Sequence, residues 1–285
     1  MNLKEIKQRI QSVKSTQKIT SAMKLVSAAK LRRAQNTIES MLPYKHKLDE
    51  ILAAFLQNTP SVDTPYIAIR DVRKVAIIAV SSNSSLCGGF NANIIRETKE
   101  TVEKYTAEGV DVELLPVGKK MSDAVRKMRR EPNLSLMEQA AAVSYNDVAT
   151  VASHLMERFV AGEIDRVELV YTHFHSAAKQ EPVKECFLPV DIVSLAGEGT
   201  ATGEFILEPS KEQLLQELLP RAIILHLFTA LLDSAAAEHA ARMMAMQIAT
   251  DNADDLIEEL VREYNKGRQQ AITNELLDIV AGSSN

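Results

Sequence analysis

Apolar residues near the N-terminus recur with the spacing of a helical seam. The first four are separated by steps of 3, 4 and 3, which is typical of the a and d positions of a coiled coil: Leu3, Ile6, Ile10 and Val13. The pattern continues less regularly through Ile19, Met23, Val26, Leu31 and Ile38. The segment from Leu3 to Gln57 has no glycine and one proline, Pro43, where we expect a kink or a local interruption. We predict a helix of about 55 residues, roughly 80 Å long.

A second helical pattern occupies the C-terminal part of the chain. It begins after Pro209 and includes about 60 residues from Arg221 to Ala281, or roughly 90 Å. Pro220 either ends a short first piece or lies in the first turn of the long helix. Both terminal segments carry clustered alanines, which allow two backbones to approach closely. Because neither helix can bury its apolar side alone, we predict that the two pair as a long antiparallel coiled coil.

Between these segments the periodicity changes to that of strands alternating with helices. Short apolar or β-branched runs predict strands at Lys74–Val80, Val110–Val117, Arg166–Phe174 and Pro182–Val193. Helices are predicted at Asn91–Tyr105, Lys119–Arg130 and Tyr145–Val160. This alternation favours a Rossmann-like α/β domain with a largely parallel sheet, in which the short connection between the last two strands allows an antiparallel pair. We expect three regions: an N-terminal helix (1–58), an α/β domain (72–195) and a C-terminal helix (209–285).

Composition supports a folded chain rich in helix. The 285 residues are 46% hydrophobic and 25% charged, and glycine and aromatic residues are scarce. Two cysteines, Cys87 and Cys186, are too few for a disulfide framework, and they form no CxxC pair. No secretory signal is visible at the start. The longest apolar stretch, Ala222–Leu232, is too short by itself to span a bilayer.

Charge is distributed unevenly along the chain. Residues 1–33 carry nine basic side chains against one acidic side chain, Glu5, a net charge of +8. The rest of the chain carries 24 basic and 37 acidic residues, a net charge of −13. A basic arm on an acidic body suggests an anionic partner. Nucleic acid is disfavoured because the arm shares its helix with an apolar seam and has no interleaved aromatic residues. Acidic loops of a protein partner fit better.

The segment SSLCGGFNAN, Ser84–Asn93, lies between a strand and a helix, where phosphate-binding loops occur. It contains neither G-x-G-x-x-G nor G-K-[ST], so we interpret it as a tight turn made by Gly88 and Gly89 before a helix. Cys87 in this loop is interpreted as a small buried residue, with a reactive thiol as the alternative. No cofactor is expected.

Other chemistry-bearing residues give weaker signals. His173 and His175 alternate on a strand and share a face, but a metal site would need a third ligand that the sequence does not supply, so no metal is expected. The histidines, serines and aspartates form no recognisable catalytic triad. An acidic run on the C-terminal helix is interpreted as a solvated face: Asp251, Asp254, Asp255, Glu258 and Glu259.

The last helical turns are apolar on more than one face. The segment Ile272–Val280 reads ITNELLDIV, and a lone rod would not expose its large apolar side chains, which are Ile272, Leu276, Leu277, Ile279 and Val280. We therefore expect another protein to surround this tip.

Three blocks of the chain resemble the gamma subunits of rotary ATP synthases. The blocks are IKQRIQSVKSTQKITSAMKLVSAAKLRRAQ (Ile6–Gln35), SSLCGGFN (Ser84–Asn91) and the run from Ser234 to Gly282. They occur in the family's order and span the whole chain, whereas the region from Gly109 to Gly203 adds little. One departure is Gly282–Ser283, where the family usually has Gly-Ala.

The resemblance implies a non-catalytic rotor shaft of a bacterial-type enzyme, present in one copy per complex. Its coiled coil would stand inside a ring of alpha and beta subunits, and its α/β foot would rest on the membrane c-ring and bind the epsilon subunit. It would be a peripheral protein on the cytoplasmic face of the bacterial inner membrane, coupling proton or sodium flow to ATP synthesis or hydrolysis. By motif match, Arg268, Gln269 and Thr273 would contact a beta-subunit loop. Met23 and Lys24 would face an acidic beta-subunit loop near the neck.

Two other functions remain open from the residues alone. A nucleotide-binding enzyme would place its chemistry on the α/β domain, and a ligand would then stabilise the isolated chain. A free-standing coiled-coil scaffold or nucleic-acid binder would use the basic arm and would show salt-dependent binding.

Overall fold

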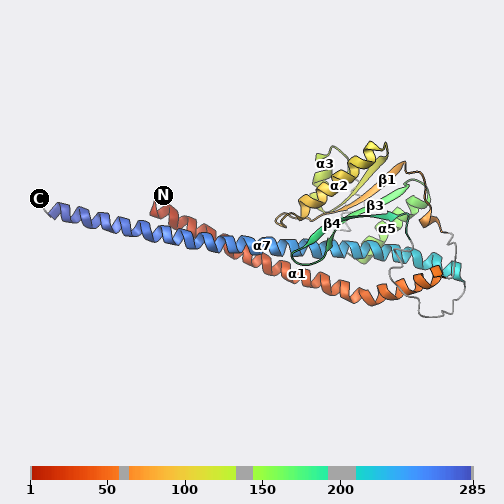
Figure 1. The fold of residues 1–285 in the computed structure, drawn as a ribbon, viewed down its shortest axis with the longest axis horizontal. Helices are drawn as coiled ribbons and strands as arrows, with labels where there is room; N and C mark the ends of the chain where they lie inside the picture. The colour runs from red at the N-terminus through yellow and green to blue at the C-terminus, as the bar shows by residue number, and fades with distance from the viewer. Residues whose placement is uncertain (1, 58–63, 133–143, 192–209, 284–285) are drawn as a thin grey trace. The chain divides into compact units, whose positions relative to one another are not determined.

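The computed structural model describes residues 2–57, 64–132, 144–191 and 210–283 (Figure 1). The chain forms two compact units. One comprises Met1–Ala28 with Arg242–Asn285, and the other comprises Ala29–Ala241. Two long helices, α1 (Leu3–Gln57) and α7 (Lys211–Ser283), contribute to both units.

The two long helices confirm the helical periodicity and correct the roles expected for their prolines. Helix α1 has the predicted bounds and continues without interruption through Pro43. Pro220 neither ends a first piece nor lies in the first turn of α7, because the helix begins at Lys211 and includes it. The turn before Pro220 is exposed at Gln216 and Glu217, where water can bond the carbonyl group that proline leaves unpaired.

The larger unit is built on a four-stranded sheet of order β2-β1-β3-β4. Its strands are β1 (Lys74–Val80), β2 (Asp111–Val117), β3 (Arg166–Phe174) and β4 (Gln180–Leu188). Strand β1 pairs in parallel with β2 and β3, and β4 is antiparallel to β3, as predicted. The last strand was expected at Pro182–Val193, but it starts two residues earlier and ends at Leu188, before Pro189. Proline has no N–H to continue a ladder. Residues 192 and 193 lie outside the described residues.

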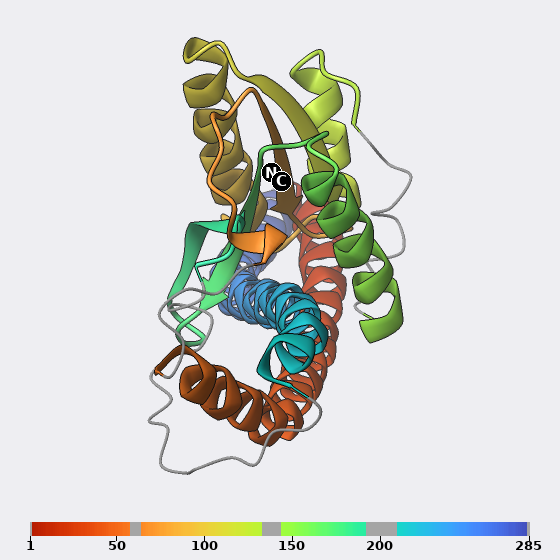
Figure 2. The same ribbon diagram turned by 90° about the vertical axis from the view of Figure 1, so that its right-hand side faces the viewer.

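Helices cover both faces of this sheet (Figure 2). The short 3-10 helix η1 (Pro65–Ile67) precedes β1. The helices between the strands are α2 (Phe90–Ala107), α3 (Lys119–Lys127) and α5 (Tyr145–Val160). Because side chains alternate along a strand, Val75, Ile77 and Ala79 of β1 pack with α2 and α3, and the intervening residues pack with α5 and α7. In the same unit, Leu48 and Leu52 of α1 pack on Ala222 and Leu225 of α7.

The first part of α7 is more apolar than the sequence estimate suggested. By length and composition alone, α7 contains an 18-residue window apolar enough to cross a membrane, whereas we counted only Ala222–Leu232. However, 56% of that window is buried inside the protein. Leu219, Ile223 and Leu227 belong to the cluster that packs on the sheet. We therefore interpret this stretch as a core helix.

A buried carboxylate lies under α2. Glu168 of β3 is 3% exposed, accepts a hydrogen bond from the Tyr105 hydroxyl at 2.5 Å and pairs with Arg166 Nε at 2.7 Å. Burial and the Glu168 carboxylate together raise the pKa of the Tyr105 hydroxyl well above its usual value. Burial also raises the pKa of Tyr171, with smaller contributions from Glu185 and Asp233.

These two phenols predict a loss of stability at alkaline pH. Below about pH 10 both tyrosines are protonated in the folded and unfolded chains, so they contribute no pH dependence. Above it, the unfolded chain releases the protons first, and each phenol lowers the free energy of unfolding by up to about 1.4 kcal/mol per pH unit. Urea unfolding of the isolated chain between about pH 9.5 and about pH 11.5 measures this slope, because the range runs from about half a unit below to about 1.5 units above the ordinary tyrosine pKa. The double variant Tyr105→Phe/Tyr171→Phe should lose less stability over this range, and equal slopes would contradict the assignment.

Candidate functional site

In the smaller unit, the first part of α1 and the last part of α7 form an antiparallel pair. Thr20 Oγ1 lies 2.8 Å from Thr250 Oγ1, and Gln17 Nε2 donates to Asp254 Oδ1 at 2.8 Å. Near the start of α1, Leu3 contacts α7 so closely that a Cβ added at Gly267 would be 3.1 Å from Leu3 Cδ2. Residue numbers fall along α1 as they rise along α7, which confirms the predicted antiparallel pairing for this unit.

The seam of this pair begins as predicted and then departs from the apolar pattern. Ile6 and Thr20 are buried, and the positions between them with low exposure keep the 3-4 spacing. Ile19 and Val26, expected in the seam, are instead 60% and 56% exposed. The reason is geometric, because a repeat of 3.5 residues decides which positions face the partner helix, whatever their polarity. Thr20 tolerates the seam because its hydroxyl donates to the Gln17 carbonyl.

On α7, the facing positions also follow a heptad. Residues with low exposure are spaced by alternating steps of four and three: Met246, Thr250, Ala253, Ile257, Leu260, Tyr264 and Gly267. The acidic run from Asp251 to Glu259 lies between these positions and is exposed, as expected for a solvated face. On α1, Lys4, Lys7, Arg9, Lys14 and Lys18 are exposed, and within the described part of the chain none of them forms an ion pair.

The predicted contact residues lie at two separate levels of the helix pair. Met23 and Lys24 are half-buried on α1, and the register of the pair places them opposite the start of the α7 segment. Arg268, Gln269 and Thr273 are exposed beyond Gly267, and Thr273 donates to the Gln269 carbonyl. At 1.5 Å per residue the two groups are roughly 30 Å apart along the axis, so the structure does not bring them together.

Beyond Leu3, α7 continues without a partner among the described residues. Residues 268–283 represent roughly 24 Å of single helix. Their large apolar side chains are exposed by these fractions: Ile272 48%, Leu276 58%, Leu277 61% and Ile279 67%. The side chain of Val280 lies outside the described residues. Such a concentration of exposed apolar groups is typical of surfaces that take part in contacts with other proteins.

In the larger unit, the loop after β1 is held by side chains on both sides. Cys87 is 1% exposed and packs with Phe90, Ala237 and Ala241, which confirms its interpretation as a small buried residue. Gly88 makes the turn with a φ of 58°, and Gly89 precedes α2 as its N-cap. The preceding Leu86 has a φ of 66° and is exposed, so the loop presents an apolar side chain from a backbone conformation that non-glycine residues seldom adopt.

Asn91 organises this loop, a role that the sequence analysis missed. Its Oδ1 accepts from the Ser82 backbone N–H at 3.1 Å, and its Nδ2 lies 2.8 Å from Ser82 Oγ and 3.0 Å from Cys87 Sγ. The Ser82 hydroxyl in turn donates to the Ser84 carbonyl. The asparagine was visible in SSLCGGFN, but only as the first turn of a helix.

The carboxyl edge of the sheet, where ligands bind in open α/β folds, is bonded to the protein's own groups. At the start of α3, the Lys119 N–H donates to Asn83 Oδ1, and the Met121 N–H donates to Ser81 Oγ at 2.7 Å. At the end of β3, the Phe174 N–H donates to Asp233 of α7. A phosphate or another anion at this edge would need these same backbone N–H groups as hydrogen-bond donors.

His173 and His175 each face a carboxylate. His173 Nδ1 lies 2.5 Å from Asp233 Oδ2, and His175 Nε2 lies 3.2 Å from Glu181 Oε2. The two rings meet edge to face with centroids 4.4 Å apart. Within the described ranges, no group of three or more His, Cys, Asp or Glu residues could hold a metal ion. Burial raises the pKa of the second cysteine, Cys186, above its usual value, which disfavours a reactive thiolate.

Comparison with known proteins relates the whole chain to one family. Residues 2–285 match the family described as ATP synthase. The ATP synthase gamma chain of Bacteroides thetaiotaomicron is 50% identical, with 99% of both chains covered. The gamma chain of Bacteroides fragilis is 51% identical over 99% of both chains, and that of Flavobacterium psychrophilum is 44% identical over 99% of this chain and 98% of its own.

Solved structures share the fold. A chain of the Euglena gracilis mitochondrial ATP synthase covers 99% of this chain and 93% of its own length, with a TM-score of 0.66 and 23% identity. A chain of the central stalk and c-ring structure of the Tetrahymena thermophila mitochondrial ATP synthase covers 81% and 99%, with a TM-score of 0.59 and 24% identity. The fold and the sequence identity along the full length agree: the chain belongs to the ATP synthase family, among its gamma chains.

Proposed function

We propose that this chain is the central rotor shaft of a proton-translocating ATP synthase. It would couple rotation of the membrane c-ring to conformational cycling of the catalytic beta subunits during ATP synthesis or hydrolysis. The observation that carries this proposal is the identity of about one half with gamma chains over 99% of both chains. A relation that extends over the whole length includes both long helices and the α/β domain.

The exposed apolar end of α7 supports the proposal that other subunits surround this part of the helix. Leu276, Leu277 and Ile279 are more than half exposed on a helix that has passed the end of its partner. A ring of alpha and beta subunits around Ile272–Val280 would cover them. Apolar contacts are non-directional, so they can hold the tip in place without opposing its rotation at particular angles.

Polar contacts with the beta subunits would lie at two levels. Arg268 and Gln269 are exposed on α7 just before the tip segment, and Thr273 is exposed within it, so all three can hydrogen-bond a beta-subunit loop. Met23 and Lys24 would face an acidic beta-subunit loop, and the exposed basic residues of α1 would add favourable charge for such a loop. The two groups of residues are roughly 30 Å apart along the helix pair. Rotation of the shaft would therefore bring each group to a different part of the beta subunits.

An asymmetric shaft explains how rotation could bias catalysis. One pair of helices cannot make equal contacts with three equivalent catalytic subunits at the same time. Each angular position would favour different conformations of the three beta subunits through differences in contact free energy. The shaft itself would be non-catalytic, with the chemistry in the beta subunits.

The α/β region would act as the foot. We propose that residues 72–195 rest on the c-ring and bind the epsilon subunit, while residues 1–58 and 209–285 form the shaft. The loop at Cys87, Gly88 and Gly89, with Leu86 exposed beside it, would be a partner surface of this foot. One copy would serve each complex, as a peripheral protein on the cytoplasmic face of the bacterial inner membrane.

The test is to tag the chain in its native host, solubilise the membranes gently and weigh the purified assembly by native mass spectrometry. We expect one copy of this chain with three copies each of two larger subunits, in a fraction that hydrolyses ATP. A free monomer or small homo-oligomer, from membranes whose intact ATP synthase contains a different shaft, would overturn the proposal.

A further inference from the structure

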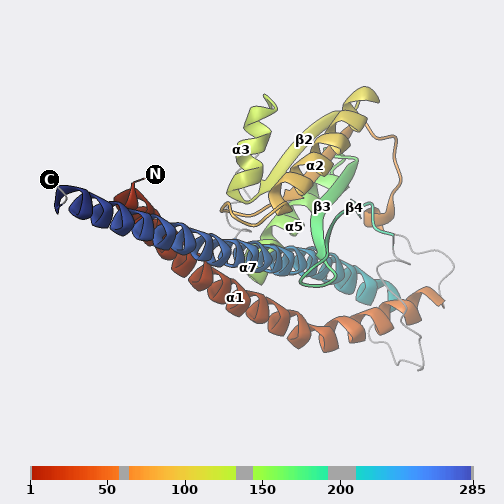
Figure 3. The same cartoon turned by 60° about the vertical axis from the view of Figure 1, so that its left-hand side comes forward.

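We propose that two reciprocal His–carboxylate pairs clamp α7 to the β3–β4 hairpin and fix the angular position of the shaft helix on the α/β domain. The inference rests on the proposed rotor function, because it identifies the residues through which torque passes between foot and shaft. All four residues belong to the larger unit. They are His173 and Glu185 on the strands, and His226 and Asp233 on α7. Within this unit, the β3–β4 hairpin lies beside α7, as Figure 3 shows.

The first pair uses both oxygens of one carboxylate. Asp233 Oδ2 lies 2.5 Å from His173 Nδ1, and Asp233 Oδ1 accepts from the Phe174 backbone N–H at 3.1 Å. The Asp233 side chain is 20% exposed. A carboxylate bonded to both a side chain and the strand backbone is held in position as well as in direction.

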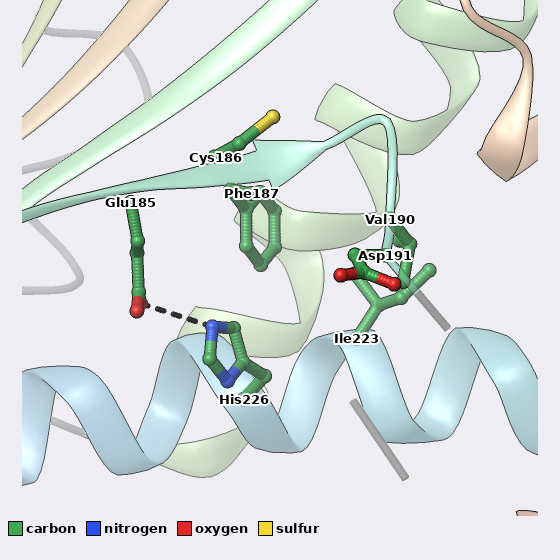
Figure 4. A pocket seen from close by; sticks show the side chains of 7 residues that line it. All are labelled: Glu185, Cys186, Phe187, Val190, Asp191, Ile223 and His226. Carbon is green, nitrogen blue, oxygen red and sulfur yellow. Dashed lines mark ion pairs between the residues drawn. The ribbon is translucent and has the colours of Figure 1, made fainter. Parts of the chain in front are cut away.

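In the second pair the histidine is on the helix and the carboxylate is on a strand. His226 of α7 lies with Nε2 3.0 Å from Oε1 of Glu185 on β4, as Figure 4 shows. This is an ion-pair distance without the directional geometry of a hydrogen bond, and Oε1 is buried with no hydrogen-bond partner among the described residues. Its compensation therefore depends on His226. The imidazole also stacks on Phe187, with ring centroids 6.2 Å apart and planes 11° apart.

The positions of the two pairs give the clamp its geometry. His226 and Asp233 are seven residues apart, so they lie on the same face of α7 about two turns apart. One pair has the acid on the helix and the other has it on a strand, so shifting the helix by a turn would not restore either contact. The apolar side chains between them, such as Leu227 and Ala230, pack on the sheet without directional preference. The polar pairs therefore select one rotation of the helix from those that apolar packing allows.

The experiment compares two double variants in the complete enzyme, in membrane vesicles. His173→Ala/His226→Ala removes both clamps. His173→Asn/His226→Gln is the matched control, because the amide nitrogens can occupy the positions of Nδ1 and Nε2. The measured quantity is ATP-driven proton pumping divided by ATP hydrolysis in the same vesicles. We expect the alanine pair to lower this ratio roughly fivefold, from the loss of two polar contacts between α7 and the hairpin, and the amide pair to retain most of it.

His175→Ala controls for the general effect of losing a histidine. Its carboxylate partner Glu181 lies within the hairpin, and its ring contacts His173 edge to face without pairing with α7, so the pumping ratio should stay near the wild-type value. A wild-type ratio in the alanine pair, or an equal loss in both double variants, would overturn the clamp. If the alanine pair does not assemble, Glu185→Gln/Asp233→Asn keeps the side-chain shapes and is expected to lower the ratio in the same direction; a wild-type ratio there would overturn the clamp. Failure of the wild-type enzyme to pump would instead count against the rotor function.

Discussion

Replacing Gly118 with alanine is expected to lower the free energy of unfolding of the chain by about 4 kcal/mol or more, a loss confined to exceptional single substitutions. Gly118 lies at the start of α3 with a φ of 90°. An added Cβ would be 2.3 Å from the Ser81 carbonyl oxygen and 2.9 Å from its carbon. These are backbone atoms, and the Ser81 N–H is bonded to the Val117 carbonyl, so the clash cannot be relieved by rotating a side chain.

Gly109→Ala is the matched control for this prediction. Gly109 has a φ of 77°, but a Cβ there would have no neighbour within 4 Å. The free energy of unfolding of this variant should fall only by the cost of placing alanine in a left-handed conformation, about 1–2 kcal/mol. Urea unfolding followed by circular dichroism measures both variants. If both variants lost the same free energy of unfolding, the close approach of Gly118 to the Ser81 carbonyl would add no cost. That result would contradict the prediction.

Replacing Leu276 and Leu277 together with aspartate is expected to reduce ATP synthesis in vesicles at least tenfold. Both side chains are about 60% exposed in the isolated chain, at 58% and 61%. In the proposed complex they would be covered by the surrounding subunits, where burying a leucine is worth roughly 1.5–3 kcal/mol and burying an unpaired carboxylate is strongly unfavourable.

The matched control keeps the apolar surface with Leu276→Met/Leu277→Met and should retain most of the synthesis activity. Exposed substitutions change stability by no more than about 0.5 kcal/mol, so the isolated aspartate variant should unfold at nearly the wild-type urea concentration. Full synthesis by the aspartate variant, with a normal amount of assembled complex, would show that no apolar sleeve surrounds the tip.

Local patterns predicted the elements well where a single physical preference dominated. The apolar run Lys74–Val80 and the longer strand Arg166–Phe174 have the predicted bounds, because β-branched residues buried in a central sheet have few alternatives. Helix α1 also has the predicted bounds. Errors arose where local signals competed with packing, as at Pro220, which propensity placed at a helix end and the core retains within α7.

The candidate site also has features that the sequence could predict and features that depended on packing. The exposed tip and the basic arm could be inferred from composition, since unpaired apolar or charged groups are visible in a sequence. Asp233 also left a signal that was not used, because it is the one acidic residue between Glu217 and Glu238 in an otherwise apolar stretch. A carboxylate in such surroundings is usually paired. Its partner His173 is 60 residues away in the chain, so the pair itself was not visible.

The sequence by itself determined the periodicities: two long helices, an α/β region between them, a basic start and an apolar end. These follow from interactions between near neighbours, which a spacing of 2 or 3.5 residues encodes directly. Only the tertiary structure decided that Thr20 rather than Ile19 enters the helix seam, that Asn91 holds the loop at Cys87, and that Asp233 and Glu185 meet histidines of other elements. Those choices depend on contacts between segments distant in the chain, and such contacts form only when the fold brings the segments together.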